Sequence, residues 1–359
     1  MTASFAIAGR EIGPGEPVYV IAELSANHGG SYDTAAGIVQ AAKAAGADAI
    51  KLQTYTADTI TIESDAPPFR HGGGSLWEGK TLHALYQEAS MPWEWQPRLK
   101  VLAESLGLHC FSSPFDPTAV EFLEEIDVPA YKVASFELVD LPLVRRMAET
   151  GKPMIISTGM ATADEIDEAV TAARSAGATQ IALLKCTSAY PSPPEALNLG
   201  AIPLMAARWG VPIGLSDHTI GESVAVAAVA LGATIVEKHI TLTHDQATPD
   251  SPFSLDASEF KGMVDAIRVA EQALAGSALG PTPEEEESRK FRRSLFVVED
   301  VAAGEPLTER NVRSIRPAAG LHTRHYEEVI GRRAASDIAR GTPLAWELLE
   351  PAAKVQPAR

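Results

Sequence analysis

Cysteine, basic residues and long apolar runs are all scarce in this chain of 359 residues. The two cysteines, Cys110 and Cys186, each stand in an apolar stretch, which argues against a disulfide framework and indicates buried, reduced thiols. Lys and Arg number 30 against 47 Asp and Glu, and the net charge of −17 argues against nucleic acid or an anionic membrane as a partner, because both need a basic face. An anionic small molecule would therefore need a local cationic pocket.

Targeting segments are lacking as well. No apolar run approaches the roughly 20 residues of a membrane span, and the first 12 residues have no basic cluster, apolar core and small-residue cleavage site of a secretory leader. We therefore expect a cytoplasmic protein. Its 45% hydrophobic content can fill a large core, and its length of 359 residues suits a barrel of about 250 residues with a small appendage.

The main pattern that is present alternates short apolar, β-branched runs with Ala-rich amphipathic stretches. Eight runs are predicted as strands, at residues 18–22, 49–53, 109–112, 130–134, 154–157, 181–185, 212–216 and 235–239. Helices are predicted at residues 32–45, 118–125, 141–149, 163–176, 197–209, 223–231 and 257–275. Eight parallel strands close a barrel, so residues 1–275 are predicted to form a (β/α)₈ TIM barrel, an α/β fold.

An open, doubly wound sheet is the competing α/β fold. It would carry a Gly-rich dinucleotide fingerprint after its first strand, and the segment Glu23-Leu24-Ser25-Ala26-Asn27-His28-Gly29-Gly30 lacks that spacing. One insertion, residues 54–95, interrupts the alternation at a place where a loop at the catalytic end of a barrel would lie. Long ordered loops there often cover substrate, and a decorative insertion is the alternative.

The composition changes after residue 275. Residues 276–289 hold Gly280-Pro281-Thr282-Pro283 and the four successive glutamates 284–287, and they are predicted as an exposed linker. Residues 290–353 contain short strand-like runs at 294–298, 305–307, 312–316 and 334–338. They are predicted as a small β-rich domain.

Lysines end four of the eight predicted strands: Lys51, Lys132, Lys185 and Lys238. The active sites of such barrels form at the carboxyl ends of the strands. A lysine there loses hydration unless an anion or a carboxylate compensates it, and although a single one is most often salt-bridged, four together favour an anion site. Hydroxyl donors at the same ends would complete a cradle, unless each is only a turn or cap residue: Ser135, Ser157, Ser188 and Ser216.

Two histidines, His218 and His239, end adjacent predicted strands, which would bring their rings together at the mouth. Two imidazoles with open coordination positions suit Mn²⁺, Fe²⁺ or Zn²⁺, and a structural role is the alternative. Glu23 ends the first strand and could accept a proton or pair with a lysine. The role of His28 is left open, and further carboxylates near the mouth are Glu137, Glu237, Asp217 and Asp250.

Together these residues resemble the sialic acid synthase family, whose members condense phosphoenolpyruvate with an amino sugar to make nine-carbon acids. Matching motifs include Ile21-Ala22-Glu23-Leu24-Ser25-Ala26-Asn27-His28, Lys51-Leu52-Gln53-Thr54-Tyr55, Ser157-Thr158-Gly159-Met160 and Glu237-Lys238-His239, with residues 111–116, 131–136, 185–191 and 214–219. Residues 291–295 and 312–317 resemble the family's C-terminal antifreeze-like (SAF) domain. The resemblance covers nearly the whole chain.

Within this family, several motifs resemble the branch that uses 2,4-diacetamido-2,4,6-trideoxy-L-altrose, among them Leu24-Ser25-Ala26, Leu76-Trp77-Glu78-Gly79 and Lys185-Cys186-Thr187-Ser188. Synthesis of N-acetylneuraminate or legionaminate from a mannosamine-type sugar is the alternative. The loop Ala247-Thr248-Pro249-Asp250 departs from the Gly-Gly-Pro-Asp form common in the family. The choice of sugar is therefore the part of the function that the motifs determine least. A non-catalytic barrel that only binds a sugar phosphate is the alternative outside the enzymes.

The resemblance implies a metal-dependent transferase. Mn²⁺ or Mg²⁺ on His218 and His239 would polarise the aldehyde of the open-chain sugar, and Glu23 would handle protons. A domain-swapped homodimer is implied too, in which Arg316 reaches the barrel of the neighbouring subunit. The implied phosphoenolpyruvate ligands are Lys51, Lys132, Ser135, Ser157, Ser188 and Ser216, and the implied sugar ligands are Gln53, Glu137, Tyr190, Asp250 and Arg316.

Overall fold

The computed structural model describes residues 5–70, 72 and 77–351, which form two compact units divided after Gly276. Each unit is described by itself. His71 and Leu76, the first residue of the Leu76–Gly79 motif, lie outside the described residues, as do the last two residues of the predicted domain 290–353. No helix in the described parts of the chain has the length and apolar character needed to cross a membrane.

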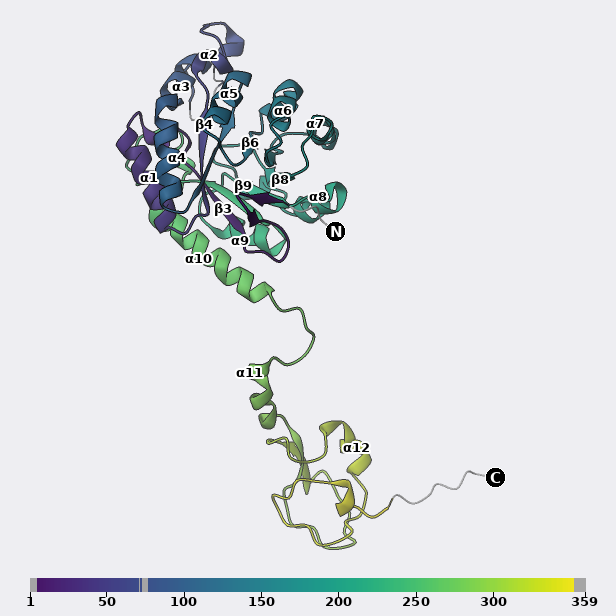
Figure 1. The fold of residues 1–359 in the computed structure, drawn as a ribbon. Helices are drawn as coiled ribbons and strands as arrows, with labels where there is room; N and C mark the ends of the chain where they lie inside the picture. Colours follow the sequence, from purple (N-terminus) through teal and green to yellow (C-terminus); the bar gives the residue numbers. More distant parts are fainter. Residues whose placement is uncertain (1–4, 71, 73–76, 352–359) are drawn as a thin grey trace. The chain divides into compact units, whose positions relative to one another are not determined.

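Eight parallel strands close into a barrel in the first unit (Figure 1). The last strand pairs with the first, from Ile235 opposite Tyr19 to His239 opposite Glu23. This closure confirms the predicted (β/α)₈ barrel and excludes the open sheet. The strands are β3 Tyr19–Glu23, β4 Ala49–Thr54, β5 His109–Pro114, β6 Tyr131–Val133, β7 Met154–Ser157, β8 Ile181–Cys186, β9 Ile213–Asp217 and β10 Ile235–His239.

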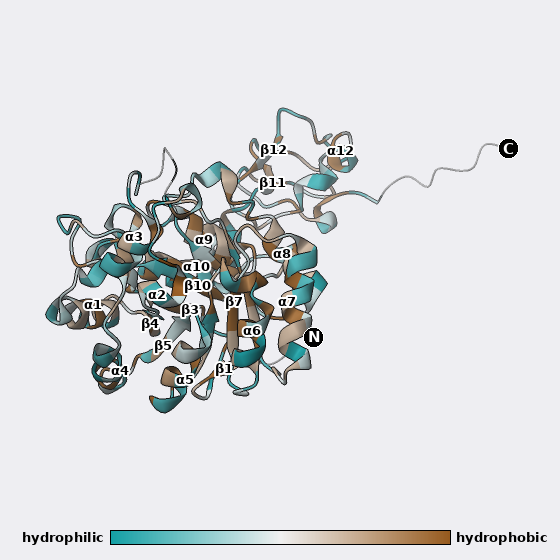
Figure 2. Ribbon diagram, turned by 90° about the horizontal axis from the view of Figure 1, so that it is seen from above, coloured by the Kyte–Doolittle hydropathy of each residue, from teal (hydrophilic) through white to brown (hydrophobic). Residues whose placement is uncertain are grey.

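The helices surround the strands and turn their hydrophilic sides outward (Figure 2). They are α1 Tyr32–Ala44, α4 Gln96–Ser105, α5 Pro117–Glu125, α6 Leu141–Ala148, α7 Ala163–Ser175, α8 Ala201–Trp209, α9 Ser223–Ala230 and α10 Ala257–Leu274. Polar N-caps fix several starts: Ser31 accepts from the N–H of Thr34, and Asp116 from that of Ala119. The helix predicted from residue 197 begins only at Ala201, because Asn198 takes a left-handed φ of 49°.

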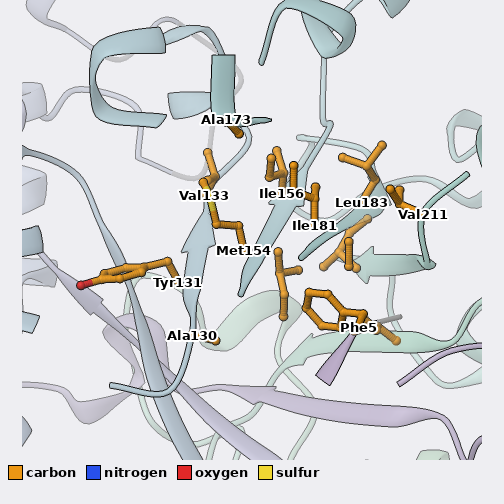
Figure 3. Close-up of a cluster of buried hydrophobic side chains, with 14 of the residues drawn as sticks. Phe5, Ala130, Tyr131, Val133, Met154, Ile156, Ala173, Ile181, Leu183 and Val211 are labelled. Atoms are coloured by element: carbon orange, nitrogen blue, oxygen red, sulfur yellow. The ribbon is translucent and has the colours of Figure 1, made fainter. Parts of the chain in front are cut away.

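A hairpin that the sequence did not indicate precedes the barrel. Its strands are β1 Ala6–Ile7 and β2 Arg10–Glu11, and the N–H of Ala6 donates to Gln180 at 2.7 Å. Phe5 and Ile7 are fully buried in the same cluster as Met154 and other residues of β7 and β8 (Figure 3). The hairpin thus adds apolar side chains to the barrel core, at about 25 cal/mol per Å² of apolar area removed from water.

The insertion after β4 carries four short helical segments: α2 Ala57–Ile60, η2 Pro67–Phe69, α3 Leu82–Ala89 and η3 Trp93–Trp95. Tyr55 anchors it, with ring centroids 5.0 Å from Phe115 and 5.9 Å from Tyr86. The indole N–H of Trp93 donates to the carbonyl of Tyr55 at 3.2 Å. The described part of the insertion is therefore packed onto the barrel rather than extended from it.

The second unit has less strand than we predicted. Its two strands, β11 Ser294–Val297 and β12 Val312–Ile315, pair antiparallel, and Leu295, Val297 and Val312 are buried. The runs predicted at 305–307 and 334–338 make isolated bridges only, because backbone pairing there is limited to single residues. The linker prediction missed two short helices, α11 Pro283–Glu286 and η7 Glu287–Phe291. The other short helices of the unit are η8 Thr323–His325, α12 Tyr326–Val329 and η9 Trp346–Leu348.

Candidate active site

Two lysines and two glutamates form a buried charged group at the carboxyl ends of the barrel strands. Lys51 Nζ lies 2.7 Å from Glu23 Oε2 and 3.4 Å from Glu237 Oε1, and Lys132 Nζ lies 3.9 Å from the same Glu237 oxygen. All four residues are at most 5% exposed. The lysines are therefore compensated by carboxylates within the protein itself.

The two carboxylates of this group differ in acidity. Burial raises the pKa of Glu23 to about 7, although Lys51 opposes the shift. Burial acts on Glu237 in the same direction, but Lys132 and Lys51 outweigh it and lower its pKa. Burial also lowers the pKa of Lys132, whereas Glu23 and Glu237 outweigh burial at Lys51 and raise its pKa. Glu237 is thus the ionised partner of both lysines, and Glu23 is the group that can change protonation near neutral pH.

The four predicted serines lie at this group or beside it. Lys132 Nζ donates to Ser157 Oγ at 2.6 Å, and Ser216 Oγ donates to Glu237 Oε1 at 3.3 Å. Ser135 and Ser188 converge on Gly159, where an added Cβ would meet their hydroxyls at 2.6 Å. The hydroxyl of Ser188 is buried and has no hydrogen-bond partner among the described residues. A small anion such as a phosphate group fits these donors, because it would satisfy the orphaned hydroxyl.

Two of the four strand-end lysines do not belong to this group. Lys238 follows Glu237 by one residue and so faces the opposite side of β10. Its Nζ donates to Asp217 Oδ2 at 2.6 Å and to the carbonyl of Thr219 at 2.7 Å, and both side chains of the pair are completely buried. Lys185 alternates in the same way with Cys186, and its Nζ donates to the Cys186 carbonyl at 2.6 Å. Our inference of four lysines around one anion is wrong, as is the placement of Asp217 at the mouth.

His218 and His239 do lie together, with ring centroids 5.4 Å apart. His218 Nδ1 lies 3.1 Å from the carbonyl of Thr187, a contact that requires the proton on Nδ1, so that in the neutral ring Nε2 carries the lone pair. His239 Nδ1 is buried without a hydrogen-bond partner among the described residues, 3.9 Å from Asp250 Oδ2. An oriented imidazole and an orphaned ring nitrogen are the donor set that a divalent metal ion needs.

The residues predicted to hold a sugar surround these groups. Gln53 Nε2 donates to Glu23 Oε1 at 3.0 Å. The ring of Tyr190 lies 4.5 Å from that of His218, and Asp250 accepts from Ser25 and from the N–H of Ala26. Burial raises the pKa of Glu137 to about 7, and its Oε2 lacks a partner among the described residues. Arg316 is exposed in the second unit, so its predicted contact with a barrel remains a prediction.

His28 and His244 lie apart from this group. His28 Nδ1 accepts from the N–H of Gly30 at 3.0 Å, so its Nε2 donates to the carbonyl of Ala89 at 3.2 Å and fastens the first loop to the insertion. His244, Asp256 and Glu259 place ligand atoms within 4.8 Å of one another near the surface. Asp256 and Glu259 there form the capping box of α10, which accounts for the arrangement without a metal.

Sequence reasoning missed how central three residues are. Glu237 contacts both lysines, and only the period of two along β10 could have separated its role from that of Lys238. Gly159, with φ of 30°, leaves the space into which Ser135 and Ser188 point. Phe253 packs 4.9 Å from His239 and 5.1 Å from Tyr190, a long-range contact that no motif announced.

A closed parallel barrel with buried acid, lysine and histidine side chains at its strand ends defines an enzyme of the TIM-barrel class. Residues 38–278 match the NeuB family and residues 292–350 match the SAF domain. The chain belongs to the NeuB family.

Relatives of known name agree with this assignment. The chain is 45% identical to the pseudaminic acid synthase of Campylobacter jejuni (strain 81-176), covering 91% of this chain and 95% of that one. It is 44% identical to the pseudaminic acid synthase of Helicobacter pylori (strain 26695), covering 93% and 98%. The crystal structure of N-acetylneuraminic acid synthetase from Leptospira borgpetersenii superposes with a TM-score of 0.71 at 30% identity, covering 80% of this chain and 95% of that one.

Proposed function

We propose that this enzyme is a pseudaminic acid synthase. It would condense phosphoenolpyruvate with 2,4-diacetamido-2,4,6-trideoxy-β-L-altropyranose and water, giving pseudaminic acid and phosphate. The observation that carries the proposal is the 45% identity to a named pseudaminic acid synthase over 91% of the chain. The geometry supports it, because the mouth combines lysine and serine donors for a phosphate with carboxylates for a polyhydroxylated sugar.

Phosphoenolpyruvate would bind to the lysine and serine side chains. Lys132 Nζ and Ser157 Oγ lie 2.6 Å apart and can both donate to the phosphate group. Ser135 and Ser188 add two more hydroxyls beside Gly159. Lys51 and Ser216 both contact Glu237 Oε1, at 3.4 and 3.3 Å, and would bind the carboxylate of the substrate. Preorganised donors of this kind act most strongly in a buried site, where water does not screen them.

A divalent metal ion, Mn²⁺ or Mg²⁺, would be held by His218 and His239. When bound, it would supply Lewis-acid polarisation of the sugar aldehyde. The residues present fit such an ion, since His218 is oriented by Thr187 and His239 Nδ1 has no other partner in the described chain. Asp250, Gln53 and Glu137 would accept hydrogen bonds from sugar hydroxyls and amide groups nearby.

The reaction forms one C–C bond and one C–O bond to water, and it breaks the C–O bond to phosphate. C3 of phosphoenolpyruvate adds to the aldehyde carbon, water adds to C2, and the resulting hemiketal phosphate loses phosphate with cleavage of the C2–O bond. Glu23 would take the proton of the attacking water, a role for which a carboxyl with pKa about 7 is well matched at neutral pH. Lys51, 2.7 Å from Glu23, would stabilise its ionised form.

The direct test measures phosphate release from phosphoenolpyruvate with each of three sugars: the altrose derivative above, N-acetylmannosamine and the mannosamine-type precursor of legionaminate. We expect release only with the altrose derivative and a divalent metal. Preference for either other sugar would instead assign the N-acetylneuraminate or legionaminate reaction. Calorimetric binding without turnover of any sugar would show a barrel that only binds its ligand.

We also propose a domain-swapped homodimer in which Arg316 completes the barrel of the partner. Complementation tests it: Arg316→Ala and Lys132→Met are each expected to be nearly inactive, and mixed subunits should recover about a quarter of wild-type activity, because half the dimers then carry one intact site. A mixture that stays inactive after unfolding and joint refolding would contradict the swap. Sedimentation of the wild-type chain as a monomer would do so as well.

A further inference from the structure

Ser25 holds a backbone conformation that is unfavourable for a residue with a side chain. It lies two residues after the end of β3, is 4% exposed and has a φ of 47°. The left-handed region brings Cβ close to the following carbonyl oxygen, so residues other than glycine are uncommon there unless a specific interaction retains them. A serine at this position therefore points to a use for its hydroxyl.

The hydroxyl of Ser25 binds a carboxylate from the far end of the barrel sequence. Ser25 Oγ donates to Asp250 Oδ2, and the N–H of Ala26 lies 3.3 Å from the same oxygen. The side chain of Asp250 is only 14% exposed, and its Oδ2 lies 3.9 Å from His239 Nδ1. Because both donors bind Oδ2, Oδ1 is left to accept from a ligand at the mouth.

The loop that carries Asp250 is fixed by a different residue. Asn27 Nδ2 donates to the carbonyl of Ile240 at 2.9 Å and to Ser254 Oγ at 2.8 Å, and Asn27 Oδ1 accepts from Thr248 Oγ1 at 2.6 Å. Ser254 Oγ in turn donates to the carbonyl of Asp250 at 2.7 Å. These contacts hold the backbone on both sides of residue 250. Ser25 is thus not needed to fold the loop, and its contact sets the rotamer of one carboxylate.

We propose that Ser25 is a positioning residue that directs Asp250 Oδ1 toward the acceptor sugar. The inference rests on the proposed function, in which Asp250 binds a hydroxyl or amide N–H of that sugar. Without Ser25, the carboxylate would lose one of its two local donors and could rotate away from the sugar. In the proposed function phosphoenolpyruvate would bind the lysine and serine side chains rather than Asp250, so its binding should not depend on Ser25.

The test compares Ser25→Gly with Ser25→Ala and with Ala8→Gly. Glycine accepts the left-handed backbone and removes only the hydroxyl, whereas alanine removes the hydroxyl and keeps the unfavourable Cβ. We expect both variants to raise KM for the sugar by about 10- to 100-fold, with KM for phosphoenolpyruvate within about twofold of wild type. The melting temperature of Ser25→Ala should lie below that of Ser25→Gly.

Ala8→Gly is the matched control. Ala8 has a φ of 48°, is exposed and belongs to the turn between β1 and β2, so glycine there relieves the same conformation far from the mouth. Its KM values should equal those of wild type. An unchanged sugar KM in Ser25→Gly would overturn the inference, and so would an equal rise in both KM values, since that would indicate general damage to the site.

A double-mutant cycle separates this inference from the proposed function. Thermal unfolding of Ser25→Gly, Asp250→Ala and the double variant measures the coupling between the two side chains without any substrate. If wild type turns over none of the sugars but the coupling is present, the proposed function fails and the contact stands. If wild type is active while coupling is absent and the sugar KM is unmoved, the positioning role fails alone.

Discussion

The buried Lys238–Asp217 pair offers the sharpest test of which strand-end lysines stabilise the fold and which bind substrate. Lys238 Nζ lies 2.6 Å from Asp217 Oδ2, and neither side chain is exposed. Burial lowers the pKa of Lys238, and the carboxylate of Asp217 opposes that shift. We expect Lys238→Met to weaken folding and to leave the binding of phosphoenolpyruvate unchanged. The same substitution at Lys132 should weaken the binding of phosphoenolpyruvate and have little effect on folding.

The magnitude follows from the charge that is left behind. Methionine retains the apolar stem of lysine, so little cavity forms, but the carboxylate of Asp217 then lies in the interior without a cation. Breaking a buried pair in this way costs about 3–5 kcal/mol, out of the roughly 5–15 kcal/mol that stabilises a typical protein. Urea unfolding at low temperature would measure this loss, and KM for phosphoenolpyruvate would be determined on the folded enzyme at the same temperature.

Two further variants complete the test. Lys261→Met removes a lysine whose contact with Asp265 is also 2.6 Å but exposed, and it should change stability by no more than about 0.5 kcal/mol. Asp217→Asn combined with Lys238→Met removes the unpaired charge while the asparagine oxygen still accepts from the N–H and hydroxyl of Thr219, so much of the lost stability should return. A Lys238→Met enzyme with wild-type stability and a raised KM for phosphoenolpyruvate would refute the assignment.

Three other outcomes are expected. Lys132→Met should raise KM for phosphoenolpyruvate at least about tenfold, because it removes a charged donor at Ser157; steady-state phosphate release measures this. Chelation should abolish phosphate release and Mn²⁺ should restore it in wild type, whereas His239→Ala should not recover; persistent activity of that variant in excess chelator would exclude the metal role. Burial raises the pKa of Glu137 from 4.5 to about 7, so the neutral carboxyl is favoured in the folded state. The stability that this gives is fully present below pH 4.5 and is lost as the pH rises through 7, because the buried side chain then ionises. Glu137→Gln should therefore gain roughly 1–3 kcal/mol over wild type between acidic pH and about pH 8, measured by urea unfolding, and parallel pH profiles would contradict the shift.

The barrel could be predicted from sequence because each strand is a short apolar run followed by an amphipathic helix. The predicted ends of β7 and β10 agree with the structure, and the other barrel strands differ by one or two residues. In the second unit the runs predicted at 294–298 and 312–316 are strands to within one residue. Those at 305–307 and 334–338 are not, because they are too short for periodicity to distinguish a strand from an extended segment with one bridge.

The residue types of the site were predicted more reliably than the directions in which their side chains point. Glu237, Lys238 and His239 are consecutive, and only the period of two along a strand separates the residues that face the mouth from Lys238. The contact between Ser25 and Asp250 spans 225 positions and could not be inferred from either local sequence. Such pairings arise from barrel closure, which brings the first and last strands side by side.

The charge balance of the mouth sets a condition on the proposed reaction. Lys51 and Lys132 already face Glu23 and Glu237, so an arriving anion has to compete for them. Lys132 is 3.9 Å from Glu237 but 2.6 Å from Ser157, and a phosphate can therefore take Lys132 and Ser157 together while Glu237 retains Lys51. The site would thus accommodate a phosphate group by reassigning Lys132 from Glu237 to the anion, without a standing excess of positive charge in a chain whose net charge is −17.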